Sequence, residues 1–135
     1  VFHEYFTPLK EPMTLEVDGK IRAIHGGGNE RIVADRALRR AAGGEYGYII
    51  HFTHGIHPAA RATGRSFIED MRSVGNDAIG MGLPWWQPGG GENHPDGVLF
   101  MQTIDLDGQR IVEDGMIVGP KKLAKLAAGL APIYG

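Results

Sequence analysis

Histidine and aspartate side chains gather in two short segments of the chain, residues 51–57 and 92–96. In an extended strand, side chains two positions apart project to the same face, so His94 and Asp96 can converge on one ion. One further imidazole would complete two histidines and one carboxylate. That set occupies one face of an octahedral ferrous ion and leaves positions open for other ligands. We therefore predict His51, His94 and Asp96 as metal ligands.

Other polar and aromatic side chains near these segments are candidates for supporting roles. We predict His54, His57 and Glu4 for proton transfer, because imidazole and carboxyl groups are common catalytic acids and bases. A His-x-Asp tripeptide also occurs often by chance, and His54 and His57 could equally be polar loop residues.

Arginines and tryptophans suggest how a substrate could be held. Arg61 and Arg72 are candidates to anchor a phenolate or carboxylate, because a guanidinium pairs well with such groups. Trp85 and Trp86 could stack on a ring, or could be a packing plug or a subunit contact in a loop rich in Pro and Gly.

The amino-acid composition limits which metal ligands and which binding partners are possible. The 135 residues include no cysteine, so any metal must be held by imidazole and carboxylate groups. The net charge is −2 without a basic run, which disfavours nucleic acid and anionic membranes as partners. No apolar stretch is long enough for a membrane span. We expect a cytoplasmic protein, and the opening on Val1 suggests a fragment of a larger chain.

The first half of the chain predicts a hairpin, a helix and a strand. Alternating apolar residues on both sides of Asp18-Gly19 indicate a hairpin over 13–24. Helical spacing of apolar residues predicts a helix over 30–42, with Asn29 as its N-cap. The β-rich run 46–52 predicts a buried strand that leads into a histidine-bearing loop.

The second half predicts more strands, one loop and a closing helix. We expect a short strand over 76–82 and a loop over 84–91. A second hairpin follows, with one strand over 98–106, a turn at Asp107-Gly108 and a return strand over 110–112. A helix over 121–130 closes the chain. The predicted class is α+β, a hairpin-rich mixed sheet with two or three helices, in one metal-binding domain over residues 1–135.

Four segments of the chain resemble the C-terminal half of the aminopeptidase T-like (thermophilic-type leucyl aminopeptidase) metalloenzymes. His3-Glu4-Tyr5-Phe6-Thr7-Pro8 is similar to a Gly-Glu-Val-Phe-Thr-x-Pro stretch whose glutamate is a metal ligand in the peptidases. Residues 51–58 resemble a Glu-x-Gly-x-Gly-x-Asn-Pro segment, residues 76–82 a Val-His-Ile-Ala-x-Gly segment, and residues 89–96 a glycine-rich run ending in His-x-Asp.

Departures from the family pattern change what the resemblance implies. His51 stands where the peptidases carry a second ligand glutamate, and Ala78 stands where they carry a ligand histidine. These exchanges turn a carboxylate-rich two-metal site into two histidines and one aspartate. In ligand pattern the chain is most similar to the 2,5-dihydroxypyridine 5,6-dioxygenases of the superfamily. The resemblance further implies a missing N-terminal α/β domain and a homo-oligomer.

The expected function is therefore that of a mononuclear non-haem Fe(II) dioxygenase. It would use O2 to cleave a hydroxylated aromatic or N-heteroaromatic ring such as a dihydroxypyridine. One alternative is a metal-dependent aminopeptidase or amidohydrolase using Zn, Co or Mn, in which the ion activates water. A second alternative is a non-catalytic assembly domain whose histidines bind nothing.

Overall fold

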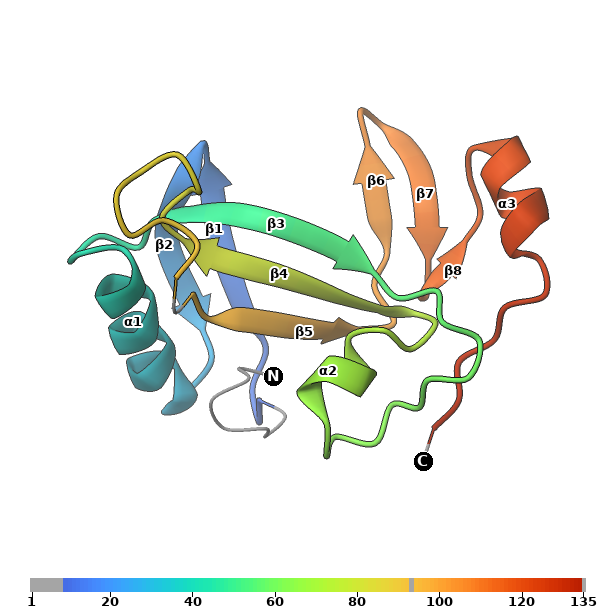
Figure 1. Ribbon diagram of the computed structural model, residues 1–135, viewed down its shortest axis with the longest axis horizontal. Coiled ribbons are helices and arrows are strands. Elements are labelled where there is room, and N and C mark those ends of the chain that lie inside the picture. Colours follow the sequence, from blue (N-terminus) through green and yellow to red (C-terminus); the bar gives the residue numbers. More distant parts are fainter. Residues whose placement is uncertain (1–8, 93, 135) are drawn as a thin grey trace. The chain divides into compact units, whose positions relative to one another are not determined.

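The computed structural model describes residues 9–92 and 94–134, so Glu4 lies outside the described part. The fold is α+β, with eight strands in three small sheets and three helices among the described residues (Figure 1). The chain divides into two compact units. Unit 1 comprises the residues up to Phe52 together with Ile79–Gly97, and unit 2 comprises Thr53–Ala78 together with the residues from Val98 onward.

The predicted first hairpin is present. Strands β1 (Met13–Asp18) and β2 (Lys20–Gly26) pair antiparallel, with Asp18 opposite Lys20. Gly19 makes the turn with a φ of 67°, a left-handed conformation that costs glycine little. The Asp-Gly signal in the sequence therefore located this turn.

Helix α1 (Glu30–Ala41) confirms the helix predicted over 30–42. Its apolar face buries Ala34 and Leu38. Asn29 occupies the N-cap position, but its side chain makes no capping bond. The carbonyl of Gly27 instead accepts the amide of Arg31, so a backbone group satisfies one of the free amides of the first turn.

The core of unit 1 forms where α1 packs with the first hairpin and the end of a central strand. Its fully or nearly fully buried members are apolar: Ile21, Ile24, Leu38 and Met81. Leu38 is 0% exposed and Met81 is 1% exposed, so the hydrophobic effect acts most strongly at these two side chains.

The middle sheet carries the histidine segments. Its order is β3–β4–β5, with β4 (Asn76–Gly82) between β3 (Tyr48–His54) and β5 (Asp96–Phe100) (Figure 1). Every residue of β4 except Ile79 is buried, as expected for a central strand. The strand predicted over 46–52 begins and ends two residues later, so His54 is a strand residue and not part of the loop beyond. The predicted burial of this strand is wrong, because every residue of β3 is half-buried or exposed.

The second predicted hairpin starts later than expected. Strands β6 (Ile104–Leu106), β7 (Gln109–Glu113) and β8 (Met116–Ile117) form an antiparallel sheet. The single strand predicted over 98–106 is wrong, because its first part belongs to β5. The extended conformation ends at Met101, which has a φ of 50°. The turn at Asp107-Gly108 is confirmed, with φ values of 49° and 77°.

Two short helices belong to unit 2. Helix α2 (Phe67–Asp70) was not predicted, and Ser66 caps it by accepting the amide of Glu69. Helix α3 (Lys121–Ala127) begins where predicted and ends three residues earlier. Within residues 9–92 and 94–134, no helix has the length and apolar character needed to cross a membrane.

Candidate metal centre

The three predicted ligands lie together in unit 1. His51 projects from β3, His94 follows the loop after β4, and Asp96 is the first residue of β5. The buried Pro95 separates the last two, and its carbonyl accepts the amide of Met81 on β4. That backbone bond holds the His94–Asp96 segment beside β4, so both side chains reach the His51 ring.

The distances among the ligand atoms suit a single small cation. The Nε2 atom of His51 lies 3.0 Å from Nε2 of His94 and 3.0 Å from Oδ1 of Asp96. Nε2 of His94 lies 3.4 Å from the same carboxylate oxygen. With metal–ligand bonds of about 2.1 Å, neighbouring ligand atoms are about 3.0 Å apart at right angles and about 3.4 Å apart in a tetrahedron. Two of the three edges therefore match one face of an octahedron.

The tautomer of His94 leaves its Nε2 lone pair available. Nδ1 of His94 lies 2.7 Å from the carbonyl oxygen of Gly91. A carbonyl can only accept, so the proton is on Nδ1 and a neutral ring presents Nε2 as an acceptor. Metal-binding histidines commonly donate their second nitrogen to a carbonyl or carboxylate in this way, which fixes the orientation of the ring.

Gly80 makes room for the ring of His51. A Cβ atom at position 80 would lie only 2.1 Å from Nε2 and 2.3 Å from Cδ2 of that imidazole. Such contacts are far inside van der Waals separation, so any larger residue at position 80 would displace the His51 ring from the cluster. The packing of His51 against His94 is edge-to-face, with ring centroids 5.0 Å apart.

The cluster is half-buried, which suits a site that must admit a ligand. The side chains of His51, His94 and Asp96 are 26%, 20% and 14% exposed. Nδ1 of His51 is buried and has no hydrogen-bond partner among the described residues. The donor set of two imidazoles and one carboxylate therefore fits a divalent transition-metal ion.

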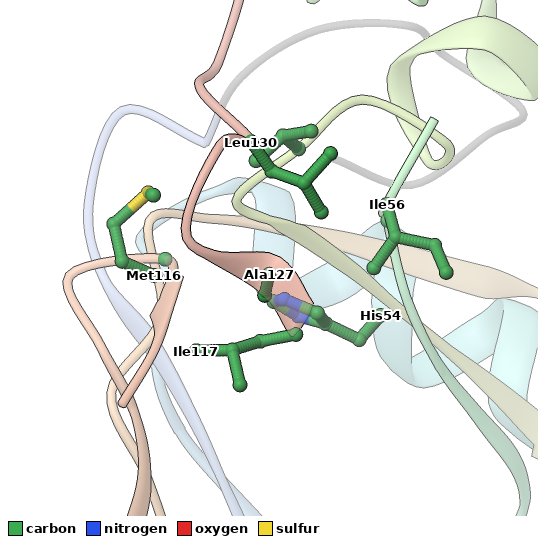
Figure 2. Close-up of a pocket in the computed structure, with 9 residues that line it drawn as sticks. His54, Ile56, Met116, Ile117, Ala127 and Leu130 are labelled. Atoms are coloured by element: carbon green, nitrogen blue, oxygen red, sulfur yellow. The ribbon is translucent and has the colours of Figure 1, made fainter. Parts of the chain in front are cut away.

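The structure pairs His54, a predicted proton-transfer residue, with a buried carboxylate in unit 2. Nδ1 of His54 lies 2.6 Å from Oδ1 of Asp77, whose side chain is 0% exposed. His54 is three positions from His51 in β3, and side chains an odd number apart in a strand point to opposite faces. Figure 2 shows the His54 ring among apolar side chains that line a cavity of about 10 Å³, room for about one water molecule.

The remaining predicted proton-transfer and anchoring residues also belong to unit 2, except Glu4, which is not described. His57 uses Nδ1 to accept the amides of Ala59 and Ala60. The backbone amide of Arg61 donates to Glu69, and a guanidinium nitrogen of Arg72 donates to the carbonyl of Ile68. None of these contacts involves the three clustered ligands.

The two tryptophans differ in their relation to the cluster. The ring of Trp85 meets that of His94 edge-to-face, with centroids 6.0 Å apart, and it also lies against Gly91. Trp86 is 80% exposed. The structure therefore places Trp85, but not Trp86, in contact with a predicted ligand.

Three residues of structural importance were not identified from the sequence. Gly80 provides the space for His51, the carbonyl of Gly91 accepts a hydrogen bond from His94, and Asp77 is the partner of His54. Asp77 alone carried a readable signal, because a carboxylate inside a buried strand requires a partner. The two glycines are among 21 in the chain, and nothing in the sequence around them indicates their contacts with the histidine rings.

Comparison with protein-family models, with curated proteins and with solved structures yields no match for this chain. The likeness to the aminopeptidase T-like metalloenzymes therefore stays a prediction from the motifs quoted above.

Proposed function

We propose that His51, His94 and Asp96 bind one ferrous ion, and that the protein of which they are part is a ring-cleaving dioxygenase. The observation that carries this proposal is the triangle of three ligand atoms with edges of 3.0, 3.0 and 3.4 Å. Two imidazoles and one carboxylate on one face of the ion leave the opposite face free, the ligand set preferred by non-haem Fe(II) oxygenases.

When bound, a ferrous ion supplies Lewis acidity and one-electron chemistry with O2, which ring opening of a hydroxylated arene requires. The chain's own residues set the geometry. The Gly91 carbonyl holds the His94 ring in one orientation, and Gly80 leaves space for the ring of His51. Asp96 supplies the negative charge that offsets part of the charge of a divalent ion.

Metal binding is tested first, because the proposal depends on it. The full chain is loaded anaerobically with Fe(II), desalted, and its iron measured by elemental analysis. We expect one ion per chain, and a loss of at least about 90% of it in His51→Ala and in His94→Ala, since each change removes one of three ligands. His25→Ala is the matched control, because His25 is an exposed unit 1 histidine that pairs with Glu16. Full iron content in both ligand variants would refute the assignment.

The reaction class is tested separately, on a preparation that holds iron. The expected result is O2 consumption with a dihydroxypyridine or another hydroxylated ring, and loss of ring absorbance. Turnover of a peptide or amide with Zn(II), Co(II) or Mn(II), without O2 uptake in the iron form, would favour the metallohydrolase instead. If ions bind under neither condition and the chain stays folded, the cluster is a structural hydrogen-bonded group.

A further inference from the structure

A hollow of about 270 Å³ is lined by residues of unit 2. The ligands of the proposed metal centre belong to unit 1, and none of them lines this hollow. Its walls come from the loop that begins at His57 and from α2 with its flanking residues. The volume is close to the lower end for small-molecule sites.

Two hydrogen bonds from backbone amides join the loop to the segment around α2. The amide of His57 donates to the carbonyl of Arg72 at 3.0 Å. The amide of Arg61 donates to the carboxylate of Glu69 at 3.0 Å. These bonds fasten the loop at two places, so the hollow needs little rearrangement to receive a ligand.

The ring of His57 presents a donor with no partner in the described part of the chain. Its Nδ1 accepts the amides of Ala59 and Ala60 at 3.2 and 3.1 Å, so the lone pair of that nitrogen is occupied. A neutral ring must then carry its proton on Nε2, which becomes a donor. Within residues 9–92 and 94–134 no acceptor contacts this nitrogen.

Two further donors line the same hollow. One guanidinium nitrogen of Arg72 donates to the Ile68 carbonyl at 3.2 Å, and no carboxylate in the described residues pairs with this side chain. The hydroxyl oxygen of Ser66 accepts the amide of Glu69, which leaves its proton free to donate. Three donor side chains, one of them a permanent cation, thus share one hollow.

The other side chains of the hollow define the anion that would fit. Ala59, Ala60 and Ile68 give it an apolar side, which favours a ligand with a short hydrocarbon part. The carboxylate of Glu69 also lines it and repels anions, a doubly charged anion such as phosphate more strongly than a singly charged one. We propose that this hollow binds a small aliphatic monocarboxylate through Arg72, His57 and Ser66.

Butyrate is the probe, with butanol and inorganic phosphate as comparisons. In amide NMR spectra of the full chain without added metal, we expect saturable shifts of Ala59, Ala60 and Arg61 with butyrate at millimolar concentrations. Butanol lacks the charge and should cause no saturable change. Phosphate should bind more weakly than butyrate, and equal or tighter binding of phosphate would overturn the choice of a monocarboxylate.

Two variants test the residues that carry the proposal. Arg72→Gln should weaken butyrate at least about tenfold, because a charge-assisted hydrogen bond is lost. His57→Asn keeps a side-chain oxygen that can accept the loop amides, but its own N–H donor lies near the position of Cδ2 and does not reach that of Nε2, so it should also weaken binding. Arg65→Gln, an exposed arginine outside the lining, is the control and should leave affinity unchanged. Unchanged affinity in both Arg72→Gln and His57→Asn, with folded spectra, refutes the site. Because no metal is present, this result is independent of the proposed dioxygenase.

Discussion

At the scale of single residues, the candidate centre depends on the glycine at position 80 as much as on its three ligand residues. Gly80 faces the ring of His51 so closely that a methyl group at position 80 would lie 2.1 Å from Nε2 of the imidazole. Metal ligands must be held within about 0.5 Å of their productive positions. A single added methyl group at position 80 is therefore enough to move His51 away from the other two ligands.

The first prediction concerns this contact. Gly80→Ala should lower metal affinity at least about tenfold, because displacing His51 removes one ligand from a set of three. Gly97→Ala is the matched control in the neighbouring strand, since a Cβ there meets Ile79 at an ordinary 3.4 Å. Isothermal titration of both variants with a divalent ion checks this. Equal affinities would show that the ring of His51 can move without consequence.

A second prediction concerns the pair formed by His54 and Asp77. Asp77 is 0% exposed, so removing its partner leaves a buried carboxylate without that hydrogen bond. His54→Ala should therefore lower the free energy of unfolding by about 3 kcal/mol. The double variant that adds Asp77→Asn should lose less than the sum of the single changes. Urea unfolding of all four proteins measures the difference, and strictly additive losses would contradict a direct interaction.

Much of the candidate site could be predicted from the sequence, because its signals are local. The His94–Asp96 spacing implies a shared face in any extended conformation, and the structure brings their ligand atoms within 3.4 Å. His51 was proposed from an expected place near a strand end, whereas it lies in the middle of β3. The roles of Gly80 and Gly91 could not be predicted, because each depends on a ring that approaches from a distant part of the chain.

At the scale of elements, a polar cluster of Asp35, Arg39 and Tyr46 connects α1 to the segment just before β3. The hydroxyl of Tyr46 donates to Asp35 at 2.6 Å, and Arg39 lies both beside that carboxylate and over the Tyr46 ring. The hydrogen bond from Tyr46, followed by the charge of Arg39, lowers the pKa of Asp35. The cluster therefore links the exposed face of α1 to a side chain that packs on the core of unit 1.

The third prediction uses the sign of that shift. A carboxyl group whose pKa is lowered by folding adds stability above its unfolded pKa of about 3.9, and this stability is lost as pH falls through the lower folded value. Tyr46→Phe should reduce the free energy of unfolding at neutral pH, and the difference from the parent should shrink at acid pH, below the unfolded pKa of about 3.9. The effect should be small, because the Asp35 side chain is 36% exposed and screened by solvent. Urea unfolding at both pH values tests it, and a constant difference would assign the loss to packing alone.

Elements with local turn signals were predicted well, and the strand over 76–82 was predicted with the bounds of β4, whereas the break at Met101 and helix α2 were not predicted. The turns at Gly19 and at Asp107-Gly108 follow from residues that adopt positive φ readily. The break at Met101 has no such signal, because a positive φ is unusual for methionine and requires tertiary support. Helix α2 was missed because it has only four residues, too few for a helical period to show.

At the scale of the whole molecule, the proposed metal ligands belong to one of the two compact units. His51, His94 and Asp96 all fall in unit 1, and so do Gly80 and Gly91. A ligand that binds only the native state stabilises it by about 2.7 kcal/mol when its concentration is 100 times Kd. The first effect of such binding is on the elements that carry the ligand atoms.

The fourth prediction follows from this division. Saturation with a divalent ion should slow amide hydrogen exchange of Ile79–Gly97 by up to about 100-fold at 100 times Kd. The sheet formed by β6, β7 and β8 should keep its exchange rates. Mass spectrometry of peptides after deuterium labelling measures both regions in one experiment. Equal slowing in the two regions would contradict a metal effect confined to the ligand-bearing unit.

The edge-to-face contact between Trp85 and His94 gives the molecule a built-in optical probe. An open-shell ion held by Nε2 of that imidazole would be close enough to the indole to quench its emission. Titration followed by fluorescence would then report occupancy of the site without a label. Trp86, which is 80% exposed, would add fluorescence that does not change with metal binding, and Trp86→Phe would remove it.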